Sequence, residues 1–236
     1  MGQRLIRVPK PRRMFTWISK TLLGAGAALA LAACQMDPAG GDTPPSRFSG
    51  PPPARMGVAH GAVVVAGPRG FCIDREVSQD ARGAQALTVL SACRGLGAGV
   101  FGPAPVHPAV LTAAVAPPGR LIDVQAAEGG LVAYFQSTRG RAALSRSGRA
   151  DTVRLQEGFA EDGAFFLHLT DSAPFAWGAV QPDYWRALLE TGGRMVTVAV
   201  LAQPGSPLTR DQGLAVLRDF IAATRNATAQ AAKPKS

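Results

Sequence analysis

Residues 184–201 constrain the fold more than any other segment, because two runs of strand-forming residues there flank Thr191-Gly192-Gly193. Valine, threonine and aromatic side chains suit a half-buried pleated surface, and glycine supplies the positive φ that a tight turn requires. The segment is therefore predicted to form a β-hairpin.

Shorter runs of β-branched and aromatic residues, bounded by glycine and proline, precede the hairpin and predict further strands. Their ranges are 61–66, 71–74, 86–93, 110–116, 152–156 and 164–170. Residues 121–138 have a looser, helix-like spacing of apolar side chains, although the pair Gly129-Gly130 weakens that interpretation.

After the hairpin, Thr209 is placed to cap a helix that is predicted to run to about residue 224. Its apolar stripe is formed by Leu214, Leu217, Phe220 and Ile221. Strands that pair in sequence, followed by a late amphipathic helix, indicate an α+β fold. We expect an antiparallel sheet of about five to seven strands with the C-terminal helix packed on one face.

The N-terminus differs in character from the rest of the chain. Six basic residues and no acidic residue lie in the first 33 positions, and residues 21–33 form an apolar stretch. This stretch is well below the ~20 residues that an α-helix needs to cross a bilayer, which favours a secretion signal over a permanent anchor. It ends in Leu31-Ala32-Ala33-Cys34.

This ending resembles the lipobox of bacterial lipoproteins at every position. The resemblance implies cleavage before Cys34, a diacylglyceryl thioether on its sulfur, and usually an acyl chain such as palmitate on the new amine. It also implies a protein held by lipid on a bacterial membrane and facing the periplasm. By analogy with enterobacterial sorting, Gln35 favours the outer membrane. The alternative is an ordinary secretory signal in which the cysteine occurs by chance.

Four regions are therefore expected. Residues 1–33 are the signal peptide, and residues 34–57 are a lipidated N-terminus and a tether, since they are rich in proline and glycine and have little apolar surface to bury. Residues 58–225 form a single globular domain, and residues 226–236 form a disordered tail.

Net charge gives little reason to expect a nucleic-acid partner. The whole chain has 25 basic and 16 acidic residues, but six of the basic residues belong to the predicted signal. The chain after the signal has 19 basic and 16 acidic residues, so its excess of positive charge is small. Nucleic-acid binding is not expected.

Cysteine usage predicts one disulfide. With Cys34 lipidated, only Cys72 and Cys93 remain in a chain exported to an oxidising compartment. We expect them to pair. The alternative is a redox or nucleophilic thiol, which would need a CxxC spacing or a basic neighbour.

The search for a metal, cofactor or catalytic motif is negative. The histidines His60, His107 and His168 lie far apart in sequence and show no ligand-pair spacing. No GxSxG, SxxK or GxxxxGK[ST] motif occurs, so no cofactor is expected. His168-Leu169-Thr170 is half of a phosphoesterase HxT pair, and a partly buried, hydrogen-bonded strand histidine is the simpler interpretation.

One cluster of basic residues is a candidate binding surface, because guanidinium groups match the geometry of phosphate and carboxylate. It consists of Arg139, Arg141, Arg146, Arg149 and Arg154. Lipid phosphates, lipopolysaccharide or an acidic protein face are its expected partners. The alternative is a solvated surface, since lysine after the signal is confined to two positions near the C-terminus.

Tyr184, Trp185 and Arg186, with Trp177 nearby, form a second candidate surface. Aromatic side chains on a strand are also typical of a sheet core, and we favour the core.

Two functions stay open. The first is a non-enzymatic envelope lipoprotein that binds a protein partner, an anionic lipid or a glycan. The second is a hydrolase that acts on cell-envelope material, with two carboxylates converging in a cleft. The candidate acids are Asp74, Asp123, Glu157 and Asp171. Residues 184–224 also resemble uncharacterised alphaproteobacterial lipoproteins and, more remotely, the PsbP/Mog1 fold, and neither likeness implies site residues.

Overall fold

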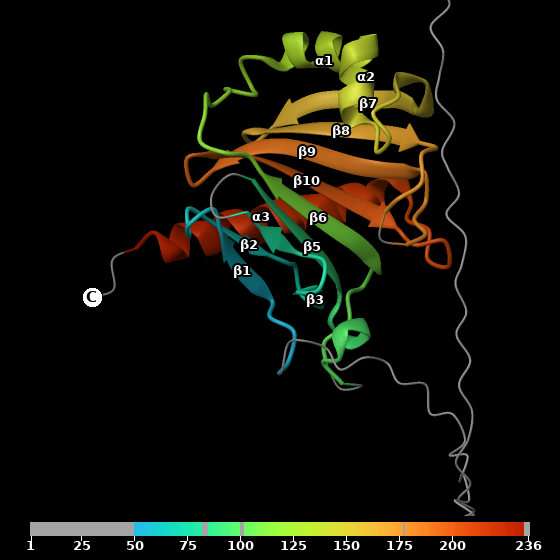
Figure 1. Cartoon of the computed structure of the whole chain (residues 1–236). Helices are drawn as coiled ribbons and strands as arrows, with labels where there is room; N and C mark the ends of the chain where they lie inside the picture. Colours follow the sequence, from blue (N-terminus) through green and yellow to red (C-terminus); the bar gives the residue numbers. More distant parts are fainter. Residues whose placement is uncertain (1–49, 82–84, 100–101, 177, 234–236) are drawn as a thin grey trace, which may run out of the picture. The chain divides into compact units, whose positions relative to one another are not determined.

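An antiparallel sheet of eight strands organises the fold of the computed structural model. Figure 1 shows how its larger strands lie side by side. Its strands are β3 (Phe71–Ile73), β4 (Gln79–Asp80), β5 (Ala86–Ala92), β6 (Ala109–Val115), β7 (Val153–Glu161), β8 (Ala164–Asp171), β9 (Asp183–Thr191) and β10 (Arg194–Ala202). Their order is β3-β5-β6-β10-β9-β8-β7, and β4 also pairs with β5. The structure describes residues 50–81, 85–99, 102–176 and 178–233.

A two-stranded sheet and three α-helices complete the described part of the chain. The small sheet pairs β1 (Arg55–Val58) with β2 (Val63–Ala66), and the helices are α1 (Glu128–Gln136), α2 (Thr138–Leu144) and α3 (Arg210–Ala231). Helix α3 contacts β2, β9 and β10, whereas α1 and α2 contact β7 (Figure 1). The predicted α+β fold, with a C-terminal helix packed on an antiparallel sheet, is confirmed.

The predicted hairpin is formed by β9 and β10, with Thr191 opposite Arg194 across the turn. Gly192 and Gly193 both adopt positive φ, at 60° and 68°. A Cβ atom at Gly192 would also collide with the backbone of Ala62, in the connection between β1 and β2. Glycine is therefore required here both by the turn and by the close approach of a second hairpin.

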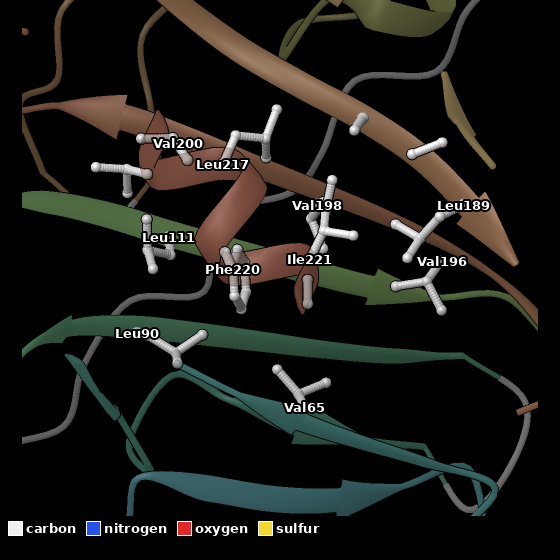
Figure 2. Packing of buried hydrophobic residues seen from close by; sticks show 14 of the residues in the cluster. Val65, Leu90, Leu111, Leu189, Val196, Val198, Val200, Leu217, Phe220 and Ile221 are labelled. Carbon is white, nitrogen blue, oxygen red and sulfur yellow. The ribbon is translucent and has the colours of Figure 1, made fainter. Parts of the chain in front are cut away.

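Helix α3 begins where the sequence predicts. The Thr209 hydroxyl accepts a hydrogen bond from the Gln212 backbone N–H, and the Gln212 side chain accepts one from the backbone N–H of Thr209. This capping box satisfies two N–H groups that a helix start leaves without partners. Figure 2 shows Leu217, Phe220 and Ile221 of α3 within the core that the sheet and β2 also line.

A second core lies on the opposite face of the sheet, because successive side chains of a strand point to opposite faces. Phe166 of β8 packs in the core under α3, whereas Phe165 and Leu167 pack with Phe135 of α1 and Leu144 of α2. Strand β8 is thus buried on both faces, which explains why it is nearly continuous in apolar residues.

The predicted helix over 121–138 is wrong in its bounds. Helix α1 starts only at Glu128, and extended Ser137 separates it from α2. The Asp123 carboxylate instead accepts hydrogen bonds from the N–H groups of Gln125 and Ala126, which gives a turn before α1. Ser137 caps α2 by accepting a hydrogen bond from the N–H of Gly140.

Both predicted ends of the globular domain are also corrected. Strand β1 begins at Arg55, within the expected tether of residues 34–57, and Met56 packs against the core under α3. Helix α3 continues to Ala231, through part of the expected disordered tail. Thr228 is buried there, and its hydroxyl accepts a hydrogen bond from the Val64 N–H of β2. A contact between residues so distant in sequence leaves no local signal.

Candidate functional site

The five clustered arginines do not form one surface, because two of them are committed to partners within the protein. Arg146 is almost buried, with 10% of its side chain exposed. Its guanidinium donates to the carbonyl of Ala173 and lies 5.0 Å from the centre of the Tyr184 ring. Asp171, which is buried, accepts a hydrogen bond from the backbone N–H of Arg146. Arg146 therefore holds loops together instead of facing a ligand.

Arg149 is exposed and pairs with a neighbouring carboxylate. Its side chain donates to both carboxylate oxygens of Asp151 at the exposed start of β7. These hydrogen bonds, which Arg149 donates, lower the pKa of Asp151 and raise the pKa of Arg149. This pair neutralises itself, so it offers little net charge to a partner.

The other three arginines keep an unpaired charge among the described residues, although Arg141 donates one hydrogen bond to the backbone carbonyl of Gln136. Arg139 of α2 is exposed, and Arg141 of α2 and Arg154 of β7 line one shallow hollow of about 390 Å³. Ala150, Val153 and Leu155 contribute apolar surface to the hollow. None of the three arginines has a carboxylate within ion-pairing distance in the described part of the chain.

The predicted disulfide is present between Cys72 of β3 and Cys93, which follows β5. It closes a sequence separation of 21 residues at one edge of the large sheet. Cys34, the predicted lipidation site, lies outside the described residues, as do the signal and most of the tether.

The four carboxylates that were candidates for a hydrolytic pair do not share a site. Asp74 and Asp123 each accept hydrogen bonds from backbone N–H groups two residues further on, as turn-forming residues do. Asp171 binds the backbone of Arg146 and Ala173. Glu157 alone belongs to a cluster of ionisable side chains.

That cluster is centred on His168 of β8. Its Nε2 lies 2.9 Å from Oδ1 of Asp183, and its Nδ1 lies 3.3 Å from Oε1 of Glu157. The ring stacks on Trp185 with centroids 4.6 Å apart. The prediction of a partly buried, hydrogen-bonded histidine is confirmed. Both ring nitrogens face carboxylates, and imidazole can donate from both only when it is doubly protonated.

Arg210 joins this cluster to helix α3. Its guanidinium donates to both carboxylate oxygens of Glu157, at 2.7 Å each, and lies 5.5 Å from the centre of the Trp185 ring. Trp185 in turn donates from its indole N–H to the backbone carbonyl of Arg210. The hydrogen bonds that Glu157 accepts from Arg210 lower the pKa of Glu157, with a smaller contribution from His168. The hydrogen bonds that Arg210 donates to Glu157 and Asp211 raise the pKa of Arg210.

One member of the cluster, Asp183, lines a small hollow at the surface. The hollow has a volume of about 160 Å³ and is lined by Asp183, Trp185, Thr209 and Gly213, among others. The Asp183 side chain is 46% exposed, whereas that of His168 is only 7% exposed. Asp183 is therefore the group of the cluster that a molecule in the hollow could touch, as a cation ligand or proton acceptor.

Sequence analysis missed Asp183 and Arg210. The four polar members of the cluster come from β7, β8, β9 and α3, so no spacing along the chain relates them. The connection between β8 and β9 spans 172–182, and a connection of that length does not fix which residues of the two strands face each other. The register places His168 opposite Trp185, and Thr170 opposite Asp183.

The second candidate surface is core, as favoured. Tyr184 and Trp185 are 3% and 2% exposed. Arg186 is half-buried, with its guanidinium 5.6 Å from the centre of the Tyr184 ring. Trp177 lies outside the described residues.

Among the described residues, no group of three or more histidine, cysteine, aspartate or glutamate side chains is placed to hold a metal ion. None of the described helices has the length and apolar character needed to span a membrane. The chain matches no family model, no curated protein and no solved structure.

Proposed function

We propose that this protein is a bacterial lipoprotein, anchored through a lipid on Cys34 and facing the periplasm, whose domain acts as a non-enzymatic binding or assembly module. The observation that carries the proposal is the sequence Leu31-Ala32-Ala33-Cys34 at the end of a basic and then apolar segment. The pairing of Cys72 with Cys93 supports it, because disulfides persist in oxidising compartments such as the periplasm. Gln35 favours the outer membrane as the final location.

The arrangement of charged groups supports binding over catalysis. His168 is buried between two acids and stacked on Trp185, so a substrate could not reach its ring without rearrangement. Arg139, Arg141 and Arg154, in contrast, have no carboxylate partner among the described residues, and Arg141 and Arg154 line one hollow. An envelope protein, an anionic lipid or a glycan is the proposed partner of these arginines.

The anchor is tested by feeding an alkyne-bearing palmitate analogue to bacteria that express the full chain. We expect the protein to carry the label and to fractionate with membranes. A Cys34→Ala variant should lose the label, while the Cys72→Ala and Cys93→Ala double variant should keep it. An unlabelled wild-type protein in the soluble fraction would contradict the anchor.

The binding role is tested by cross-linking in cells, followed by recovery of the tagged protein. The informative variant changes Arg139, Arg141 and Arg154 to Gln, because Arg146 and Arg149 are committed within the domain. Its matched control changes Arg55, Arg69 and Arg120 to Gln, because these three arginines are exposed and form no ion pair among the described residues. An envelope partner lost only from the first variant supports the proposal, whereas equal recovery from both argues against it.

A hydrolase acting on envelope material is the second candidate, because Glu157 and Asp183 converge on His168 beside a hollow. Its test is turnover of isolated envelope material by the wild type and by Asp183→Asn. Asp162→Asn, in the exposed turn between β7 and β8, is the control. Activity that only Asp183→Asn abolishes would favour the hydrolase over the binding module.

A further inference from the structure

The hollow between α2 and β7 is more specific than a general basic surface. Arg141 and Arg154 line it together with Gln136, and Ala150, Val153 and Leu155 contribute apolar atoms. We propose that this hollow binds a phosphate group between the two guanidinium groups, with an attached apolar portion resting on the half-buried side chains of Ala150 and Leu155. The inference rests on the proposed binding function and names the ligand chemistry of one part of its surface.

No carboxylate of the described residues competes with a ligand for these two guanidinium groups. Asp151 also lines the hollow, but Arg149 donates to both of its oxygens. That pairing keeps Asp151 directed to Arg149 instead of to Arg141 or Arg154. The charge left in the hollow is therefore that of two cations.

A phosphate monoester matches the two guanidinium groups in charge and in geometry. A phosphate monoester carries about −1.5 to −2 charges near neutral pH, close to the opposite of two guanidinium groups. Its tetrahedral oxygens can accept hydrogen bonds from two directions at once, and arginine supplies planar pairs of donors. A single carboxylate would balance only one of the two arginines.

The two arginines lie on regular elements of the fold, Arg141 on α2 and Arg154 on β7. Arg141 donates a hydrogen bond to the carbonyl of Gln136, near the end of α1. Arg154 lies on β7, paired with Thr170 of β8, and the next side chain towards the N-terminus, Val153, is buried. The backbone of both arginines is therefore already fixed, and ligand binding has to order only their side chains.

The test is calorimetry on the full-length protein in a non-ionic detergent, with two probes. The first probe is inorganic phosphate, and the second is dihexanoyl phosphatidic acid, which has the same anionic group on short apolar chains. Binding of the second probe tenfold or more tighter identifies an amphiphile such as a lipid headgroup as the source. Equal affinities would support the phosphate site, would overturn the apolar contact, and would identify a soluble phosphate compound as the source.

Three variants show whether the hollow is responsible. Arg141→Gln and Arg154→Gln should each weaken phosphate binding by about tenfold or more, which is typical of losing a charge-assisted hydrogen bond. Arg69→Gln is the matched control, because it removes one positive charge from an exposed position between β2 and β3 that does not line the hollow. It should change the affinity less than about twofold, as expected for a screened surface charge.

Two outcomes would overturn the inference. One is the absence of binding of either probe to the wild type, and the other is an equal loss in all three variants, which would indicate general electrostatic attraction. Arg141→Gln also removes the bond to Gln136, so Arg154→Gln decides the matter if the first variant unfolds. Labelling at Cys34 is measured independently, so failure here leaves the proposed anchor untouched.

Discussion

His60 adopts a left-handed backbone conformation, with φ of 60°, in the connection between β1 and β2. This conformation costs a residue with a Cβ atom about 1–2 kcal/mol, and glycine avoids most of that cost. The His60 side chain is exposed, so little packing is lost with it. We expect His60→Gly to raise the free energy of unfolding by about 0.5–1 kcal/mol, measured by urea denaturation.

The control for this prediction is Ala222→Gly, an exposed position within α3. The same kind of change there should lower the free energy of unfolding by about 1 kcal/mol, because glycine is a poor helix residue. A loss of stability in both variants would show that His60 makes contacts that offset its backbone strain.

Glu157 gives a residue-level prediction about pH. Its pKa is lowered in the folded protein by the hydrogen bonds from Arg210, while partial burial acts in the opposite direction. The resulting stabilisation is present above the unfolded-state pKa of about 4.3 and is lost as the pH falls through the folded-state pKa. We expect the free energy of unfolding to fall less between pH 5 and pH 3 in Glu157→Gln than in the wild type. Equal decreases would contradict the coupling.

At the level of elements, α3 protects the edge of β2 through two threonines one helical turn apart. Thr228 Oγ1 accepts from the N–H of Val64 at 3.0 Å, and Thr224 Oγ1 accepts from the N–H of Ala66 at 3.4 Å and donates to its carbonyl at 3.2 Å. An edge strand otherwise leaves such groups without protein partners. The hydroxyls thus replace the neighbouring strand that β2 lacks on this side.

Replacing either threonine with valine keeps the shape of the side chain but removes these hydrogen bonds. We expect Thr224→Val and Thr228→Val each to lower the free energy of unfolding by about 1–3 kcal/mol, because a buried backbone group is left without a partner. Amide exchange at Val64 and Ala66 should become faster. Thr197→Val on β10 is the control, and it should be nearly neutral.

The elements that the sequence predicted are those with a complete local signal. The hairpin of β9 and β10 has glycines at its turn, and α3 has a capping threonine before an apolar stripe. The sequence did not predict strand β1 or the end of α3. Both elements pack against β2, and the contacts of α3 with β2 join residues that are far apart in the chain. The α1–α2 boundary depends on Ser137, whose capping role competes with continuation of the helix.

The candidate sites also divide into those that the sequence predicts and those that depend on contacts between distant residues. Cys72 and Cys93 could be paired from composition and the predicted signal alone. The sequence could not show that Arg146 and Arg149 have carboxylate partners whereas Arg141 and Arg154 have none among the described residues. Those carboxylates come from β8 and from a loop, so the difference depends on the fold. The cluster around His168 required the register of β8 against β9, which no local pattern supplies.

At the level of the whole molecule, the disulfide joins β3 to the residue that follows β5, at the edge of the sheet opposite β7. Closing a sequence separation of 21 residues is worth about 3 kcal/mol, chiefly by restricting the unfolded chain. We expect the Cys72→Ala and Cys93→Ala double variant to lose about this much free energy of unfolding in urea denaturation. Reductant should lower the stability of the wild type to that of the variant and leave the variant unchanged.

The same bond connects stability with the proposed location. Protein recovered from the envelope should show no maleimide-reactive thiol at Cys72 or Cys93 until it is reduced, whereas protein retained in the reducing cytoplasm should show both and unfold at lower urea. Cys34→Ala should remain oxidised if export still occurs, because lipidation and disulfide formation are separate reactions. Reactive thiols in envelope-derived protein would contradict the export of a folded, oxidised domain, even if Cys34 carried lipid.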